Sequence, residues 1–193
     1  MKILQLITNL ISIALLVFTS QLMDSFTPDE PPNSAPRIHK TLLIDRAFTE
    51  EEAEFITMAA IEWSNATNHV VDIDVVQLPN DEELLLLNSI IITHASPDSP
   101  DVLIREAVTG DVVLGLYSRR LGIGVIQIVS SRIIESQYKA VVLHELGHAL
   151  GLDHNEGLEG VDTLMCPYID FAADHITPTD LKKFCKLYDC SKN

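Results

Sequence analysis

The feature that most constrains this chain is residues 144–154, which hold three of its seven histidines and two glycines. His144 and His148 are four residues apart, so on an α-helix their side chains lie on one face, one turn apart. Gly151 can adopt the positive φ that ends a helix and turns the chain back. The turn then brings His154 back toward the imidazoles of His144 and His148. The stretch therefore predicts a helix, a tight turn and three imidazoles brought to one place.

Three convergent imidazoles are typical of a zinc site, and catalytic zinc has three protein ligands and one open position. Glu145 follows the first histidine and can face a water molecule in that position. Histidine pairs on a helix are often surface or satisfied core residues, and a glutamate beside them also occurs in chains that are not enzymes. The third histidine at a fixed spacing makes coincidence a poor explanation. We therefore predict one Zn²⁺ bound by His144, His148 and His154.

Residues 144–154 are similar to the metzincin signature, His-Glu-x-x-His-x-x-Gly-x-x-His, which in that family is followed by a methionine-containing turn, the Met-turn. Residues 164–168, Leu-Met-Cys-Pro-Tyr, resemble that turn. The amino-acid sequences of both segments most resemble those of the matrixins, the matrix-metalloprotease group, and of their secreted bacterial relatives. The astacins are a weaker alternative, because they are expected to carry tyrosine where this chain has Pro167. Asn155 departs from the serine usual in vertebrate matrixins.

The resemblance implies an α+β chain with a metzincin-type zincin fold. That fold has a twisted mixed sheet with an antiparallel edge strand, a long helix, the zinc-site helix and a C-terminal helix. It also implies a zinc endopeptidase that acts on proteins or peptides, with Glu145 as general base and Met165 as an apolar floor under the histidines. By the same resemblance, the residues expected to contact the substrate are Leu114, Gly115, Leu116, Pro167 and Tyr168.

Three other functions stay open at this point. One is a catalytically idle, metzincin-like binding module, against which the intact Glu145 counts, because an inactive copy has no need of that carboxylate. Another is an inhibitor or surface-adhesion protein that uses the edge strand. The third is a zinc hydrolase that acts on a substrate other than protein. Stoichiometric zinc together with a chelator-sensitive peptidase activity would separate these functions from an endopeptidase.

Length and charge narrow the class of protein further. A chain of 193 residues with 47% hydrophobic residues suits one domain with an ordinary core, and we expect a monomer. A formal net charge of −15 argues against nucleic acid and anionic lipid as partners, since both would repel it.

The N-terminus resembles a targeting segment. Lys2 precedes a short apolar run that ends near Phe18, which predicts a secretory signal peptide at residues 1–22. An uncleaved membrane anchor is the alternative, and only then would the protein contact a membrane. Four prolines make residues 23–37 a linker, and residues 38–193 form the catalytic domain. A secreted protein, extracellular or periplasmic, is expected.

The apolar pattern predicts the order of elements. Strands are expected at residues 38–44, 70–78, 86–93, 110–117 and 124–130, of which the fourth resembles the matrixin edge strand. Helices are expected after a capping box at Thr49–Glu52, at residues 136–150, and from a cap at Thr177 to about Tyr188. Trp63 lies in the buried stripe of the first helix.

Two further features leave alternatives open. His94, Asp98, Asp101 and Asp111 lie where matrixins carry structural zinc and calcium, but the zinc-binding pattern is missing. Carboxylates and carbonyls suffice for Ca²⁺, while a solvated acidic loop is the simpler interpretation. The chain's three cysteines predict one disulfide and one free thiol, either Cys185 with Cys190 or Cys166 with one of them.

Overall fold

The computed structural model describes residues 38–78, 89–120, 122–155 and 161–190. The expected signal segment, the linker and the first residues of the strand predicted at 86–93 lie outside these ranges. Among the described residues, no helix is both long and apolar enough to cross a membrane.

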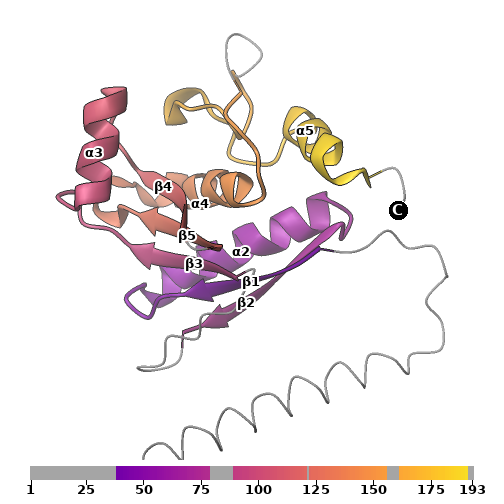
Figure 1. The fold of residues 1–193 in the computed structure, drawn as a ribbon, viewed down its shortest axis with the longest axis horizontal. Helices are drawn as coiled ribbons and strands as arrows, with labels where there is room; N and C mark the ends of the chain where they lie inside the picture. Colours follow the sequence, from indigo (N-terminus) through magenta and orange to yellow (C-terminus); the bar gives the residue numbers. More distant parts are fainter. Residues whose placement is uncertain (1–37, 79–88, 121, 156–160, 191–193) are drawn as a thin grey trace, which may run out of the picture. The chain divides into compact units, whose positions relative to one another are not determined.

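A mixed sheet of five strands forms the framework of the described residues (Figure 1). The strands are β1 (Ile38–Ile44), β2 (Val71–Gln77), β3 (Ser89–His94), β4 (Gly115–Arg120) and β5 (Ile123–Ile128), in the order β2-β1-β3-β5-β4. The first three and β5 pair in parallel, while β4 pairs with β5 in antiparallel orientation. This confirms the predicted mixed sheet with an antiparallel edge strand.

Four α-helices accompany the sheet in the described residues, namely α2 (Glu50–Ala66), α3 (Pro100–Thr109), α4 (Glu135–Ala149) and α5 (Pro178–Tyr188). Helix α2 begins at the predicted capping box: the Glu52 N–H donates to the Thr49 hydroxyl at 3.2 Å, and the Thr49 N–H donates to the Glu52 carboxylate at 2.8 Å. Thr177 caps α5 in the same way. Both caps satisfy N–H groups that the first turn of a helix leaves unpaired.

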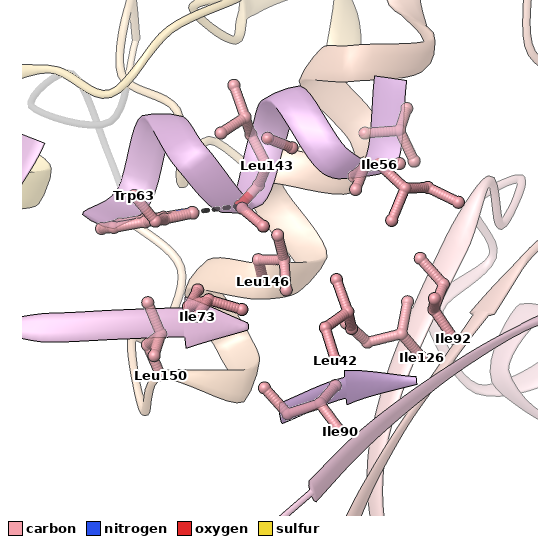
Figure 2. Packing of buried hydrophobic residues seen from close by; sticks show 14 of the residues in the cluster. Leu42, Ile56, Trp63, Ile73, Ile90, Ile92, Ile126, Leu143, Leu146 and Leu150 are labelled. Carbon is pink, nitrogen blue, oxygen red and sulfur yellow. Dashed lines mark hydrogen bonds between the residues drawn. The ribbon is translucent and has the colours of Figure 1, made fainter. Parts of the chain in front are cut away.

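The core lies where α2 and α4 pack against each other and onto the sheet (Figure 2). Trp63 of α2 is fully buried, as predicted, and its indole N–H donates to the backbone oxygen of Leu143 in α4 at 3.0 Å. Truncating such a residue to alanine costs roughly 3–5 kcal/mol. The contact fixes α4 against α2 and thereby fixes the helix that carries the first two histidines.

The prediction of a solvated acidic loop at residues 94–111 is wrong, because α3 lies within it. The sequence does carry the signals of a helix: Pro100 occupies the first turn after Ser99, and Gly110 ends the helix with a φ of 76°. The acidic residues of this segment favoured the interpretation as a solvated loop, so these helix signals were not recognised. The helix forms because Val102 is fully buried in a small apolar cluster, which a solvated loop would leave exposed.

The edge strand begins later than predicted. Residues 110–117 were expected to form it, but β4 starts at Gly115. The backbone of Val113 is already bonded elsewhere: its N–H donates to Glu106 at 3.0 Å, and its carbonyl accepts from Arg132 at 3.0 Å. The first bond joins the segment before β4 to α3 directly, and Arg132 in turn donates to Glu106 of that helix.

The strand predicted at 124–130 is β5, which ends at Ile128 because the chain enters a 3-10 turn at Ser130–Arg132. The zinc-site helix predicted at 136–150 is α4, and the last predicted helix is α5, which ends at Tyr188. Cys185 and Cys190 form the disulfide, and Cys166 is a buried free thiol.

Candidate metal centre

Helix α4 holds the first two imidazoles in fixed orientations. Nδ1 of His144 lies 2.8 Å from the carbonyl oxygen of Leu164, and Nδ1 of His148 lies 2.8 Å from that of Leu152. A carbonyl oxygen only accepts, so each Nδ1 carries the proton and donates it. In the neutral rings, each Nε2 is therefore left with a lone pair.

The turn after α4 brings in the third histidine. Gly151 has a φ of 88°, as the sequence predicts, and the Leu152 N–H returns to the carbonyl of Gly147 at 3.0 Å. Nε2 of His154 consequently lies 3.2 Å from Nε2 of His144 and 3.1 Å from Nε2 of His148.

These three nitrogens fit a bound cation. The Nε2 lone pairs of His144 and His148 both face the ring of His154. A neutral imidazole can donate at most one proton, so it cannot satisfy both lone pairs. A tetrahedral zinc with bonds of about 2.0–2.1 Å holds its ligand nitrogens roughly 3.3–3.4 Å apart, close to the observed spacing. His144, His148 and His154 are the one group of potential metal ligands found among the described residues.

Burial keeps the two helix imidazoles neutral. It lowers the pKa of His144 from 6.5 to about 3, with a further contribution from the charge of His148. Burial also lowers the pKa of His148. Both rings therefore present lone pairs near neutral pH, which is the form that a metal ion requires.

Glu145 is buried beside the histidines, with 5% of its surface exposed. Its carboxylate accepts a hydrogen bond from the backbone of Tyr117 in β4, while its Oε2 atom has no partner among the described residues. Burial raises its pKa to about 8 in the metal-free chain. An orphaned, buried carboxylate oxygen next to three imidazoles suits a reacting water molecule better than a structural role.

Met165 lies beneath the helix, in the turn expected from the sequence. It is fully buried, and a Cβ on Gly147 would come within 2.5 Å of its sulfur. The Asn155 N–H donates to the Met165 carbonyl at 2.8 Å, which joins this turn to the segment that carries His154. Met165 thus packs against α4 between the two helix histidines.

The geometry agrees with a known family. The matrixin family model matches residues 43–189, most of the chain. The chain belongs to the matrixin family. Family and fold together make it a zinc metallopeptidase, and the three imidazoles supply a fitting site for the metal. No curated protein matches the chain significantly.

Three solved structures align with the chain. Archaemetzincin from Methanopyrus kandleri aligns with a TM-score of 0.50 at 12% identity, over 81% of this chain and 97% of that chain. Myroilysin aligns with a TM-score of 0.49 at 11% identity, over 81% of this chain and 95% of that chain. Metalloproteinase-II from Bacteroides fragilis aligns with a TM-score of 0.48 at 13% identity, over 83% of this chain and 56% of that chain. At such identities, the likeness concerns the fold alone.

In this matrixin, a cavity of about 600 Å³ opens over the three histidines and Glu145. The five residues expected to contact substrate, Leu114, Gly115, Leu116, Pro167 and Tyr168, all line it. The structure therefore brings together two segments about fifty residues apart in the sequence, the start of β4 and the Met-turn.

Two residues near the site were missed by sequence analysis. Asp180 is fully buried, and its carboxylate accepts from the backbone of Leu164 at 3.0 Å and of Met165 at 3.2 Å. It thereby holds the carbonyl that orients His144. The capping pattern at the start of α5 signals a polar Asp180, but not its burial under the Met-turn. The other missed residue is Arg105, which lines the cavity from the unpredicted α3.

The acidic segment offers no support for a calcium site in this matrixin. His94 lies 3.4 Å from the carboxylate of Glu52 and stacks on Phe48. Asp101 lies in the first turn of α3, whereas Asp111 lines the cavity. The structure does not gather these acids into a group of ligands in the described part of the chain.

Proposed function

We propose that this matrixin is an exported, zinc-dependent endopeptidase that hydrolyses peptide bonds of extracellular proteins, with Glu145 as its general base. One observation carries the proposal. Three imidazole nitrogens and a buried carboxylate meet in an open cavity beside an unpaired edge strand.

His144, His148 and His154 would hold the zinc through Nε2. When bound, zinc supplies a Lewis acid that lowers the pKa of a water molecule to about 7 and polarises a carbonyl group. The hydrogen bonds from Nδ1 of His144 and His148 to backbone carbonyls keep the rings aimed at one point. Such outer contacts raise the basicity of imidazole ligands.

Glu145 would accept a proton from the attacking water and deliver it to the leaving amine. Its unpartnered Oε2 is free to receive that proton, and the Tyr117 backbone orients the carboxylate. The pKa of Glu145 is near 8 in the metal-free chain, and it falls when a dication binds nearby. A general base works best when its pKa lies near the operating pH.

Strand β4 offers a surface for an extended peptide. It pairs with β5 on one side, and the Leu114 carbonyl accepts from the Val129 N–H at 2.9 Å. In an antiparallel pair such bonds alternate along the strand, so Gly115 and Tyr117 turn their backbone groups away from β5. The backbone N–H of Tyr117 donates a hydrogen bond to the carboxylate of Glu145. The backbone of Gly115 is then available to pair with a substrate strand.

The Met-turn would form the opposite wall of the substrate site. Pro167 and Tyr168 are the last two residues of the turn and line the cavity, and Tyr168 is 55% exposed. A half-exposed aromatic ring at the mouth of a cavity can pack on a substrate side chain.

Export is supported by the cysteines as well as by the N-terminal sequence. Cys185 and Cys190 form a disulfide across the end of α5. Disulfides persist in oxidising compartments and are rare in the cytosol.

Incubating the purified chain with a diverse peptide mixture, with and without a zinc chelator, tests the proposal. Cuts that are lost on chelation and restored by stoichiometric zinc are the expected result. A zinc-loaded chain that leaves all peptides intact would refute it, and a hydrolysed non-peptide substrate would point to a different hydrolase.

A further inference from the structure

Arg105 introduces a positive charge into a cavity whose other charged lining residues are acidic, apart from the imidazoles. Those acids are Asp111, Glu145, Asp153 and Asp170. The whole chain has a formal net charge of −15, so an arginine at this position is unusual for its surroundings.

Helix α3 holds Arg105 in place. Val102, one turn before it, is fully buried, and Glu106, the next residue, accepts hydrogen bonds from Arg132 and from the backbone of the segment before β4. Arg105 and Thr109 are one turn apart on the helix, and both line the cavity. The anchored helix therefore presents this face to the cavity beside the start of the edge strand.

No ion pair joins Arg105 to a carboxylate in the part of the chain that the structure describes, and its side chain is exposed. It nevertheless lines the same cavity as Glu145 and His148, in which a substrate would lie. Its exposed guanidinium therefore has hydrogen-bond donors to offer a substrate in that cavity.

We propose that Arg105 is a specificity-determining residue that binds a carboxylate of the peptide substrate. The inference rests on the proposed peptidase function. A guanidinium pairs with carboxylates through two parallel hydrogen bonds, which gives geometric selectivity as well as affinity. The acidic residues elsewhere in the cavity repel carboxylates, so the preference is confined to one substrate position. The carboxylate comes either from an aspartate or glutamate side chain or from the substrate's free C-terminus.

The test compares matched peptides derived from mapped cleavage sequences. At each position in turn glutamate is exchanged for glutamine, and each peptide is made with a free and with an amidated C-terminus. The zinc-loaded wild-type chain should prefer the carboxylate at one position by about five- to tenfold in kcat/KM, the size of one partly exposed charged hydrogen bond. The amidated peptides show which source supplies that carboxylate.

Three variants assign the preference to Arg105. Arg105→Gln should reduce kcat/KM more for the preferred peptide than for its neutral partner, so that the preference for the carboxylate disappears. Arg105→Lys should retain part of the preference, because the charge stays while the two-pronged geometry is lost. Arg105→Glu should favour lysine at the same position. Lys183→Gln removes one positive charge from the exposed face of α5 and serves as the matched control, with an unchanged preference expected.

Peptide binding to Glu145→Gln, measured by fluorescence anisotropy, keeps this inference separate from the proposed function. A wild-type chain that cuts nothing refutes the peptidase function. The matched glutamate and glutamine peptides are then taken from the uncut peptide mixture, and their binding still decides the role of Arg105. Equal affinity for both peptides would overturn the inference. So would an Arg105→Gln variant that loses cleavage of both peptides equally, because Arg105 would then act on Glu145 or on the fold.

Discussion

Gly115 lies so close to Glu145 that no side chain fits between them. A Cβ on Gly115 would be 2.6 Å from Oε1, 2.7 Å from Cγ and 2.9 Å from Cδ of Glu145. Real Cβ contacts essentially never come below 3.0 Å, so the carboxylate would have to move. The glycine at the start of β4 thus sets the position of the proposed general base.

Gly115→Ala should therefore reduce turnover while zinc stays bound. A displacement of about 1 Å in a reacting group can cost roughly 100-fold in rate, and we expect a loss of that order in kcat/KM. Zinc content by mass spectrometry and peptide cleavage measure the two effects. Gly124→Ala in β5 is the control, since its Cβ would meet the Tyr117 ring at 3.1 Å and its three nearest atoms belong to Tyr117 and Ile90 and not to Glu145. Equal losses in both variants would contradict the special role of Gly115.

Glu145→Gln should keep the fold and the metal but lose about 10²–10⁴-fold in turnover, the usual contribution of general acid–base catalysis. Glutamine preserves the shape of the side chain and removes its ability to take a proton. Glu135→Gln, at the exposed start of the same helix, should behave like the wild type. Near wild-type cleavage by the Glu145 variant would rule out its proposed role.

His154→Ala should weaken zinc binding by more than about 100-fold, since even residues behind a metal ligand contribute 10–100-fold. Peptide cleavage should disappear with it. Competition with a fluorescent chelator gives the affinity, and His175→Ala at an exposed position is the control. A two-histidine variant that binds zinc as tightly as the wild type would remove His154 from the ligand set.

Asp180→Asn should destabilise the chain by about 3 kcal/mol, because a buried acceptor would become a donor that faces other donors. The carboxylate accepts from Thr177, Asn155 and the backbone of the Met-turn at 2.6–3.2 Å. Urea unfolding measures the loss. Asp174→Asn, at an exposed site, should stay within about 0.5 kcal/mol of the wild type. Comparable effects of the two substitutions would mean that the buried network contributes little.

Metal-free chain should lose stability as the pH falls from about 6.5 toward 3. The folded pKa of His144 lies at about 3, below its ordinary 6.5, so the folded state binds fewer protons than the unfolded chain in this window. Glu145 acts in the opposite direction: its folded pKa of about 8 makes stability fall as the pH rises from 4.5 toward 8. Glu145→Gln should therefore abolish the loss on the alkaline side, as unfolding curves across this range would report. A pH dependence unchanged by that substitution would contradict the assignment.

Activity of the zinc-loaded chain should show an acid limb, followed at lower pH by loss of the metal. Protons compete with zinc for the three imidazoles, and Glu145 must be ionised to act as a base. Parallel profiles of cleavage and bound zinc check this order. Full activity after the zinc has left would overturn the mechanism.

Local patterns predict much of this protein. The capping box at Thr49, the cap at Thr177 and the positive φ of Gly151 depend on neighbours within a few residues, and the structure confirms each. Helix α3 was missed although Pro100 and Gly110 mark its ends, because the burial of Val102 that stabilises it involves residues distant in the sequence.

The sequence by itself determined the three imidazoles and the adjacent carboxylate, because the helix repeat and one glycine turn place them within eleven residues. Only the tertiary structure decided what surrounds them. Gly115 reaches Glu145 across the contact of β4 with α4, and Asp180 reaches the Met-turn from α5. Such contacts depend on how the sheet and helices pack, and that packing results from burial summed over the whole core, which no local pattern records.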